Sequence, residues 1–481
     1  MDRARLIKLG VALLVPLVVL LIPREAIPID GLTVTQHRTV AIFALALCLW
    51  VLEPIPIFAT SVLVIVVSLM TISDRSVKWL LPPEGTAPEV FGELVPYRSI
   101  MATFADPIIM LFLGGFFLGA AATKYRLDTN LGRVLLKPFG TRTAWVMLGM
   151  MAITAVFSMF MSNTATTAMM LAVLMPVLKS IDADDPARIS FALAIPFAAN
   201  VGGIGTPIGT PPNAVGMKYL VDADGQPLVT FAGWMGFGLP FVVVLLVLAW
   251  LLLLLMFRPS KPRLEVEFRG RWMRSGQAWV VYVTSAATIG LWLTGGTVHG
   301  MTSHTVALIP VAVFCCTGIM TSQDLKGLSW DVLWLVAGGF ALGLALSETG
   351  LSGALVESIP FETLPALLIV GIAVVLTYLM ATFMSNTAAA NLVLPIMAAL
   401  GASLSSLAPL GGQMMLILVV TFSASLAMTM PISTPPNAMA YATGWIKTGH
   451  MAKAGTAVGL LGLGLTAAMA VLMNLLGFFD R

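Results

Sequence analysis

Charged side chains are scarce in this sequence. Only 10% of its 481 residues are Asp, Glu, Lys or Arg, whereas 58% are hydrophobic. A soluble globular protein carries about 25% charged residues, so this chain cannot cover itself with a polar surface. The net charge of +3 is also too small to indicate a nucleic-acid partner.

Cysteine and histidine are rare as well, with three and four copies. Cys48, Cys315 and Cys316 lie inside apolar runs, and their spacing matches neither a disulfide framework nor a zinc site. We interpret them as packing residues. The histidines show no metal-ligand pattern, and paired carboxylates or histidines at membrane depth are lacking. We therefore expect neither an enzyme nor an organic cofactor.

Apolar runs long enough to cross a bilayer recur along the chain, for example at 237–256 and 457–478. About 20 such residues span the hydrocarbon core as a helix. The short alternating segments of a membrane β-barrel are not evident. The sequence therefore predicts an all-α polytopic membrane protein. Its first apolar stretch is interpreted as a retained span, because no cleavage site of small residues follows it.

Two apolar segments, 143–179 and 364–400, are predicted to be re-entrant hairpins. The piece from Ala165 to Leu178 is too short for a crossing. The remaining segments give eleven predicted spans, two of them interrupted. These spans are 6–22, 38–52, 56–72, 107–123, 188–220 (interrupted), 232–257, 277–294, 304–320, 330–346, 412–446 (interrupted) and 452–478.

The basic residues indicate the orientation, because cytoplasmic loops are rich in Lys and Arg. With the N-terminus inside, most of the 26 basic residues fall in cytoplasmic segments, especially 124–142 and 258–276. This holds only if both hairpins return to the side they came from. We expect a multi-pass protein of the plasma membrane, here a bacterial inner membrane, surrounded by lipid. Its N-terminus would be cytoplasmic and its C-terminus outside.

Three sequence motifs occur twice, in the same order and at offsets of 223 or 224 residues. Such spacing indicates an ancient duplication in inverted topology, as in many secondary transporters. These repeated blocks are FMSNTA at 160–165 and 383–388, TPPNA at 210–214 and 434–438, and LGGFFLGAA at 113–121 with AGGFALGLA at 337–345. The predicted regions are an N-terminal span and loop (1–37), a first repeat (38–257, hairpin about 143–179, broken helix about 188–220), a cytoplasmic basic linker (258–276) and a second repeat (277–481, hairpin about 364–400, broken helix about 412–446).

The Ser-Asn-Thr copies suit hairpin tips at membrane depth. Ser, Asn and Thr are strong N-cap residues, whose side chains accept from the first backbone amides of a helix. A helix start also carries partial positive charge and attracts anions. Two mirror-related tips that meet near the midplane would donate to a small divalent anion from both sides. The predicted donors are Ser162, Asn163, Thr164, Ser385, Asn386 and Thr387.

The stretches GGIGTPIGTPPNA (202–214) and TMPISTPPNA (429–438) interrupt apolar segments. Proline disfavours helix at the residue before it, and glycine permits unusual dihedral angles. We expect helices unwound in mid-membrane, with free carbonyl groups that can bind a hard cation such as sodium. No unpaired Arg or Lys is close in sequence to either tripeptide. Helix ends and bound cations must then offset the charge of a dianion.

Each feature also has a purely structural interpretation. A single Ser-Asn-Thr is as easily an ordinary helix cap, but two copies that are each followed by TPPNA favour a binding site. The Gly-Gly-Phe blocks at Gly114 and Gly338 are interpreted as places of close helix packing. We place Glu53 near the membrane interface, at a Pro-rich turn.

The repeated text resembles the divalent anion/sodium symporter family, which carries dicarboxylates, citrate or sulfate. The resemblance runs from about residue 38 onward and implies a homodimer of eleven-span protomers. It also implies an elevator-like motion, in which the hairpins, the broken helices and the spans after them move against a scaffold. The matching stretches are FMSNTATTAMMLAVLMPVL, GTPPNA, TFMSNTAAANLVLPIM, STPPNA, GGFFLGAA and ETGLSGAL.

The resemblance also implies roles for individual residues. The substrate contacts would be Ser162, Asn163, Thr164, Ser385, Asn386, Thr387, Thr434 and Pro435. One sodium site would use Ser158, Ser162, Asn163 and the carbonyl of Gly209, and its mirror would use Ala381, Met384, Ser385, Asn386 and Ser433. The mirror site departs from the family pattern, because Ala381 stands where a Thr is often found. This departure leaves the number of coupled sodium ions open.

We predict a sodium-coupled importer of divalent anions, with four-carbon dicarboxylates such as succinate, malate and fumarate as substrates. Sodium would be the co-transported ion. Uptake of sulfate, citrate or another tricarboxylate is an alternative, because hydroxyl and amide donors bind carboxylate and sulfate alike. Sodium-independent exchange of dicarboxylates is a second alternative.

Overall fold

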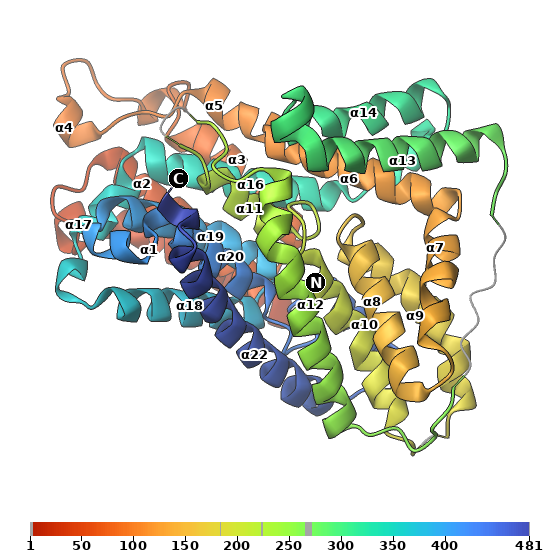
Figure 1. Ribbon diagram of the computed structural model, residues 1–481. Helices are drawn as coiled ribbons and strands as arrows, with labels where there is room; N and C mark the ends of the chain where they lie inside the picture. The colour runs from red at the N-terminus through yellow and green to blue at the C-terminus, as the bar shows by residue number, and fades with distance from the viewer. Residues whose placement is uncertain (1–2, 183, 223–224, 265–271, 481) are drawn as a thin grey trace.

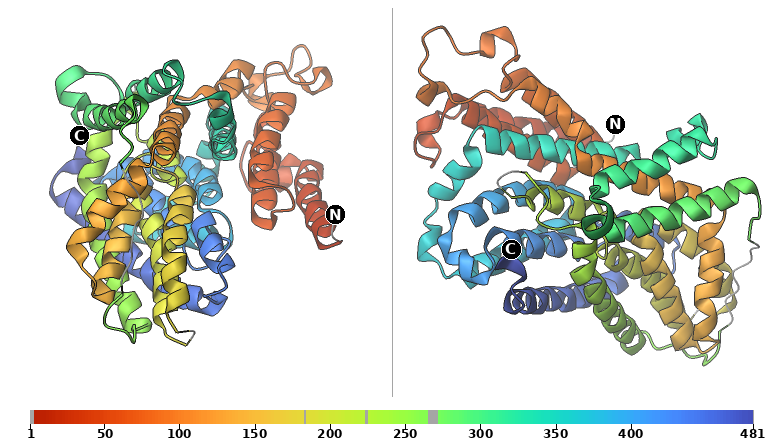
Figure 2. Two further views of the ribbon diagram at one scale, coloured as in Figure 1. Left: turned by 90° about the vertical axis from the view of Figure 1, so that its right-hand side faces the viewer. Right: turned by 45° about the horizontal axis from the view of Figure 1, so that its top comes forward.

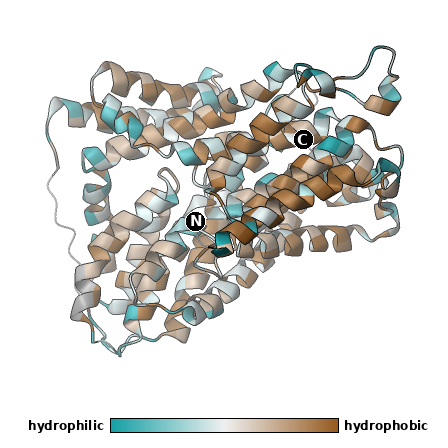
Figure 3. Ribbon diagram, turned by 180° about the vertical axis from the view of Figure 1, so that it is seen from behind, coloured by the Kyte–Doolittle hydropathy of each residue, from teal (hydrophilic) through white to brown (hydrophobic). Residues whose placement is uncertain are grey.

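The computed structural model describes residues 3–182, 184–222, 225–264 and 272–480 (Figure 1). Over these residues the chain forms helices joined by turns, and it contains no β-strand. Hydrophobic residues run along the helices, while hydrophilic residues gather at helix ends and in connecting segments (Figure 3). The predicted all-α architecture is therefore confirmed for the described residues.

Eight helices within the described ranges are long and apolar enough to cross a membrane. Two of these, Ala366–Phe383 and Asn386–Ser403, belong to the second predicted hairpin. Segment length therefore does not by itself mark that hairpin as re-entrant. The first hairpin also holds a longer helix than the sequence suggested, with 18 residues from Asn163 to Ser180. The other six candidate spans are Arg3–Leu21, Val34–Leu52, Tyr97–Lys124, Phe231–Met256, Trp330–Glu348 and Thr448–Leu475.

One set of helices, here called the outer group, includes α6, α13 and α14, which run along the upper edge of Figure 1. Within the group α1 packs against α2, α2 against α3, α3 against α16, and α6 against α14. Figure 2 shows the N-terminal helices standing at one side of the molecule. The outer group consists of α1 (Arg3–Leu21), α2 (Val34–Leu52), α3 (Ile57–Thr71), α6 (Pro107–Lys124), α13 (Gly276–Thr294), α14 (Ser303–Cys316) and α16 (Trp330–Glu348).

The second set, here called the inner group, contains both Ser-Asn-Thr copies. α8 and α9 form one helical hairpin and α18 and α19 form the other, since the two helices of each pair are in contact across a short turn. α10 packs against α8, α9 and α12, and α20 packs against α18, α19 and α22. The inner group consists of α8 (Thr143–Ser158), α9 (Asn163–Ser180), α10 (Ala187–Gly203), α11 (Pro211–Tyr219), α12 (Phe231–Met256), α18 (Ala366–Phe383), α19 (Asn386–Ser403), α20 (Gly412–Ser425), α21 (Pro435–Ala442) and α22 (Thr448–Leu475).

Short helices occupy several connections between the predicted spans. One of them, α7, lies within the basic segment 124–142. In the predicted linker 258–276, residues 265–271 lie outside the described residues, and α13 begins at its end, at Gly276. The short helices are α4 (Pro88–Phe91), α5 (Tyr97–Ala102), α7 (Leu127–Leu136), α15 (Ser322–Lys326) and α17 (Leu351–Glu357).

The interpretation of the cysteines as packing residues is wrong for two of the three. Cys48 in α2 is partly buried, but Cys315 and Cys316, at the end of α14, are exposed. Lipid tails are as apolar as a protein core, so an apolar side chain in a membrane helix has no need to face inward. An apolar run therefore does not predict burial inside the protein.

An exposed ion pair ties the end of α6 to the turn after α14. Lys124 donates hydrogen bonds to Asp324 Oδ2 (2.6 Å) and to the carbonyl of Ile319 (2.8 Å). The hydrogen bonds from Lys124 and Thr321 lower the pKa of the Asp324 carboxyl to about 2. Because exposed pairs add little stability, this pair mainly positions the turn.

The two Gly-Gly-Phe blocks lie where helices of the outer group cross closely. A Cβ added at Gly338 in α16 would lie 2.3 Å from the Cβ of Ser61 in α3. A Cβ added at Gly114 in α6 would lie 2.2 Å from the carbonyl oxygen of Ala307 in α14. These glycines let the helices pack backbone to backbone, in the manner of small residues at membrane helix interfaces.

We expect Gly338→Ala to lower the apparent melting temperature of the purified protein. The added methyl overlaps the Ser61 backbone, so α3 and α16 must move apart, at a cost of about 1–3 kcal/mol. Gly371→Ala in α18 is the matched control, because nothing lies within 4 Å of a Cβ added there. Equal melting temperatures for the two variants in a thermal unfolding assay would contradict the packing role.

Candidate functional site

Both Ser-Asn-Thr copies form the turn of a helical hairpin. Ser162 is the N-cap of α9, and its Oγ accepts a hydrogen bond from the backbone N–H of Ala165 (3.2 Å). Ser385 is the N-cap of α19, and its Oγ accepts from the backbone N–H of Ala388 (3.1 Å). Each cap begins a helix of 18 residues. The partial positive charge of both helix starts therefore points out of the two turns.

Both TPPNA copies lie at helix breaks, as the sequence predicts. α10 ends at Gly203 and α11 begins at Pro211, while α20 ends at Ser425 and α21 begins at Pro435. Thr434 is the N-cap of α21, and its Oγ1 accepts from the backbone N–H of Asn437 (3.3 Å). Two further helix starts are thus available beside the two hairpin turns.

The side-chain amide of the asparagine in each TPPNA block donates hydrogen bonds to the unwound stretch before it. Asn213 Nδ2 donates to three backbone carbonyls of the first stretch, and Asn437 Nδ2 donates to two of the second. The expectation of free carbonyls is therefore wrong for these five groups. The accepting carbonyls are those of Gly203 (3.1 Å), Ile204 (3.3 Å) and Thr206 (2.8 Å) for Asn213, and those of Met428 and Met430 (both 3.0 Å) for Asn437.

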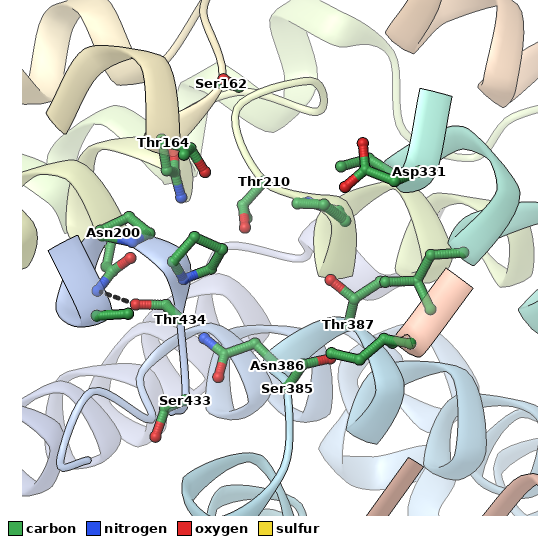
Figure 4. Close-up of a pocket in the computed structure, with 18 of the residues that line it drawn as sticks. Ser162, Thr164, Asn200, Thr210, Asp331, Ser385, Asn386, Thr387, Ser433 and Thr434 are labelled. Atoms are coloured by element: carbon green, nitrogen blue, oxygen red, sulfur yellow. Dashed lines mark hydrogen bonds between the residues drawn. The ribbon is translucent and has the colours of Figure 1, made fainter. Parts of the chain in front are cut away.

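A cavity of about 490 Å³ lies where the two hairpin turns and the two helix breaks come together (Figure 4). The outer group closes one side of the cavity through the start of α3 and through α6 and α16. Gly209 and Ser433 from the predicted sodium sites line the cavity, and so do all eight residues predicted to contact substrate. These eight are Ser162, Asn163, Thr164, Ser385, Asn386, Thr387, Thr434 and Pro435.

Most of the first predicted sodium site gathers around Gly203. Ser158 is fully buried and its Oγ donates to Asn163 Oδ1 at 2.5 Å. A Cβ added at Gly203 would lie 2.8 Å from Asn163 Oδ1 and 2.9 Å from the carbonyl oxygen of Gly209. The missing side chain thus allows these oxygens to approach one another. Ser162 also lines the cavity beside Asn163.

The second predicted sodium site is assembled differently. Ser433 Oγ donates to the carbonyl of Thr382 (2.8 Å), and the Ser433 carbonyl accepts from the backbone N–H of Asn386 (3.4 Å). Asn386 Oδ1 is buried and has no hydrogen-bond partner among the described residues. Ala381 and Met384 are buried but do not line the cavity. Ala381 can offer only its backbone, whereas Ser158 offers a hydroxyl.

Two acidic residues line the cavity from the outer group, and sequence reasoning assigned neither to it. Glu53 lies at the expected Pro-rich turn, where it ends α2 in a left-handed conformation (φ 47°). Partial burial raises the pKa of the Glu53 carboxyl, and nearby Lys8 opposes this shift. Asp331, in the first turn of α16, faces Thr387 across the space in Figure 4. Among the described lining residues none is Lys, Arg or His.

Asn200, near the end of α10, is a third lining residue that the motifs did not reveal. Its Nδ2 donates to Thr434 Oγ1 (3.2 Å) and to Asn437 Oδ1 (3.1 Å), so it links the two helix breaks. The first of these bonds is drawn in Figure 4. The sequence signal was a single amide within the apolar run FALAIPFAANVGG.

An ion pair joins the two groups of helices. Lys218 in α11 contacts Asp106, the N-cap of α6, and its Nζ lies 5.4 Å from the centroid of the Phe340 ring in α16. Asp106 is 9% exposed, and its side chain also caps α6 at the N–H of Ile108 (3.0 Å). This contact sets how the broken helix is seated against the outer group.

A largely apolar, all-helical chain with a cavity between two hairpin turns and two broken helices is the architecture of a multi-pass membrane transporter. The chain belongs to the citrate transporter family, CitMHS, whose family model matches residues 47–412. It is therefore a transporter and not an enzyme. The resemblance to the divalent anion/sodium symporters is confirmed by this match and by the relatives that follow.

Two relatives match over most of their length. The sodium-dependent dicarboxylate transporter SdcS of Staphylococcus saprophyticus is 30% identical over 462 residues, which cover 88% of this chain and 84% of the relative. A transporter of Haemophilus influenzae described as uncharacterized is 31% identical over 404 residues, which cover 78% and 83%. Among solved structures, the YdaH transporter of Alcanivorax borkumensis has a similar fold. Its TM-score is 0.51 at 15% identity, over 78% of this chain and 88% of that one.

We expect Asn437→Ala to lower the melting temperature markedly. The change removes the donor of the buried Met428 carbonyl, at about 1–3 kcal/mol for an unsatisfied group, whereas the Met430 carbonyl keeps the backbone N–H of Ser433 (3.3 Å). Asn474→Ala is the matched control, because the amide of Asn474 makes one exposed hydrogen bond to Pro409 (3.0 Å) at the end of α22. If both variants unfold at the wild-type temperature, Asn437 does not hold the break.

Proposed function

We propose that the protein is a sodium-coupled symporter of divalent anions, with four-carbon dicarboxylates as its substrates. The observation that carries the proposal is a cavity with hydroxyl and amide donors on two facing turns, and with no basic side chain among its described lining residues. The name of the Staphylococcus relative, a sodium-dependent dicarboxylate transporter, supports the same assignment.

The anion would be held by the two hairpin turns. The Oγ atoms of Ser162 and Ser385 accept from backbone amides, which leaves their O–H groups to donate. Asn163 Oδ1 accepts from Ser158, which leaves its Nδ2 to donate as well. Each carboxylate of the anion can therefore meet donors and a helix start, and hydrogen bonds to a charged acceptor are the stronger kind.

Bound cations would offset the negative charge of the anion inside the cavity. Without them, a dianion would enter a space that already holds the carboxylates of Glu53 and Asp331 and that has no basic residue among its described lining. One sodium would bind at Ser158, Asn163 and the carbonyl of Gly209. The second would bind near Asn386 Oδ1 and Ser433, because an unpartnered buried oxygen is a natural ligand for a hard cation.

Citrate is the second candidate substrate. The family model that matches this chain is that of a citrate transporter, and a cavity of about 490 Å³ is within the range of pockets that hold small organic ligands. Citrate presents the same carboxylates together with a hydroxyl group, so the same turns can hold it. Competition by citrate against labelled succinate distinguishes one shared site from selectivity for the smaller anion.

We further propose the arrangement that the resemblance implies. The protein would be a homodimer in the bacterial inner membrane, with its N-terminus in the cytoplasm and its C-terminus outside. The two repeats would have inverted topology, and both hairpins would be re-entrant. The inner group would then move as a unit against the outer group, carrying the cavity across the membrane. The grouping of both hairpins and both broken helices in one set supports this division, although α16 of the outer group also packs against α19.

Succinate uptake into proteoliposomes should require sodium. We expect uptake to rise with an inward sodium gradient and to fall to the level of empty liposomes when choline replaces sodium, because the cavity then lacks its counter-charge. Uptake that is indifferent to the sodium gradient would remove the coupling from the proposal and leave dicarboxylate transport in place.

Asn163→Ala and Asn386→Ala should each reduce uptake about tenfold or more, since each removes an amide that serves anion and cation binding. The helices should remain capped, because Ser162 and Ser385 supply the caps. Asn474→Ala, outside the cavity, serves as control. Wild-type uptake in both variants, measured on protein of unchanged melting temperature, would mean that the turns are structural only.

A further inference from the structure

A further buried acceptor at the cavity, besides Asn386 Oδ1, has no partner among the described residues. Asn200 is 3% exposed, and its Oδ1 makes no hydrogen bond among the described residues, although the residue lines the cavity. Figure 4 shows its side chain at the edge of the open space, next to Thr434. A buried polar atom without a partner is costly, so a native protein that keeps one invites a functional explanation.

The orientation of the Asn200 amide follows from its neighbours. Asn437 Nδ2 faces the carbonyl oxygens of Met428 and Met430, which can only accept. Asn437 must therefore turn its Oδ1 toward Asn200, and Asn200 must turn its Nδ2 toward that oxygen at 3.1 Å. Asn200 Oδ1 is therefore the atom of this pair that has no hydrogen-bond partner among the described residues. The group that Asn200 has left for a ligand is thus an acceptor, and not a donor.

A second unpartnered group accompanies it. Ser425, the last residue of α20, is 2% exposed and lines the same cavity, and its Oγ has no hydrogen-bond partner among the described residues. A serine hydroxyl can donate its proton as well as accept one. Asn200 and Ser425 therefore offer one acceptor and one donor, from the two helices, α10 and α20, that end at the two breaks.

We infer that Asn200 and Ser425 form a subsite for an uncharged hydroxyl group of the substrate. A hydroxyl needs an acceptor for its proton and can take a donor on its oxygen, and the pair provides both. A carboxylate or sulfate oxygen can only accept, so it gains nothing from Asn200 Oδ1. The subsite selects 2-hydroxy dicarboxylates over the same acids without the hydroxyl. This inference rests on the proposed function and names the substrate class of that same site.

The expected preference is large enough to measure. A dianion without the hydroxyl leaves Asn200 Oδ1 and Ser425 Oγ buried and unpaired in the complex. Sites that are built to bind a substrate hydroxyl reject the analogue that lacks it, and one unsatisfied buried group corresponds to roughly tenfold in affinity. Malate and succinate are the natural probes, because both are four-carbon dianions and differ in one hydroxyl.

The test measures the dissociation constants of malate and succinate by calorimetry on the purified protein in sodium. We expect the wild type to bind malate about tenfold more tightly than succinate. Ser425→Ala removes a hydroxyl that has no partner in the structure, and Asn200→Ala removes the acceptor. Each variant should bring the malate-to-succinate ratio toward one. Ser425→Ala keeps the test valid if Asn200→Ala fails to fold.

Ser423→Ala is the matched control on the same helix. Ser423 is fully buried and does not line the cavity, and its Oγ donates a hydrogen bond to the carbonyl of Val419 (2.6 Å). Removing this hydroxyl should therefore leave the malate-to-succinate ratio unchanged. Equal affinity of the wild type for the two acids, or full malate preference in Ser425→Ala and Asn200→Ala, would overturn the subsite while the proposed function stands. If neither acid binds in sodium, the proposed function fails and the subsite fails with it.

Discussion

Interrupted backbone hydrogen bonding inside an apolar protein is the constraint on which the rest of the structure depends. A helix that breaks in such surroundings leaves amide and carbonyl groups that water cannot satisfy, so the protein itself must supply their partners. Ser162 and Ser385 cap the helices that start at the two hairpin turns. Asn213 and Asn437 hold the carbonyls at the two breaks. The polar residues of both motifs are therefore needed for folding before they are needed for any cargo.

The same constraint decides which groups are left for cargo. Groups used to repair the backbone are no longer available, and the groups that remain are hydroxyl protons, the Asn163 amide and a few unpartnered oxygens. The only formal charges on the described lining are those of Glu53 and Asp331. Within the proposed function, it follows that a cation must neutralise the cavity before or together with the dianion. An uncompensated anion would be repelled at short range in a medium of low dielectric constant.

Sequence patterns located the elements well, because apolar periodicity and proline or glycine interruptions act locally. A hairpin from residue 143, interruptions at 202–214 and 429–438, and Ser-Asn-Thr caps at the hairpin tips were predicted, and helices begin or end at or near these places. The clamping role of Asn213 was not predicted, since it depends on the path by which the chain returns after the break. Glu53 and Asp331 were missed because no pattern in the chain links them to residues that are distant in sequence. The exposed Cys315 was misjudged because lipid and core favour the same residue types.

The two halves of the cavity are alike in their turns and unlike in the residues around them. The residue 224 positions after Asn200 is Ala424, and the residue 223 positions after Ser158 is Ala381. Like turns suit the like carboxylates of a dicarboxylate, whereas a hydroxyl on one carbon makes the substrate itself unsymmetrical. A single acceptor on one side is what such a substrate requires, and a matching acceptor on the other side would remain buried without a partner. Within the proposed function, the repeated Ser-Asn-Thr and TPPNA blocks would supply the shared anion chemistry, and positions that differ between the two copies, such as Asn200 and Ala424, would supply selectivity.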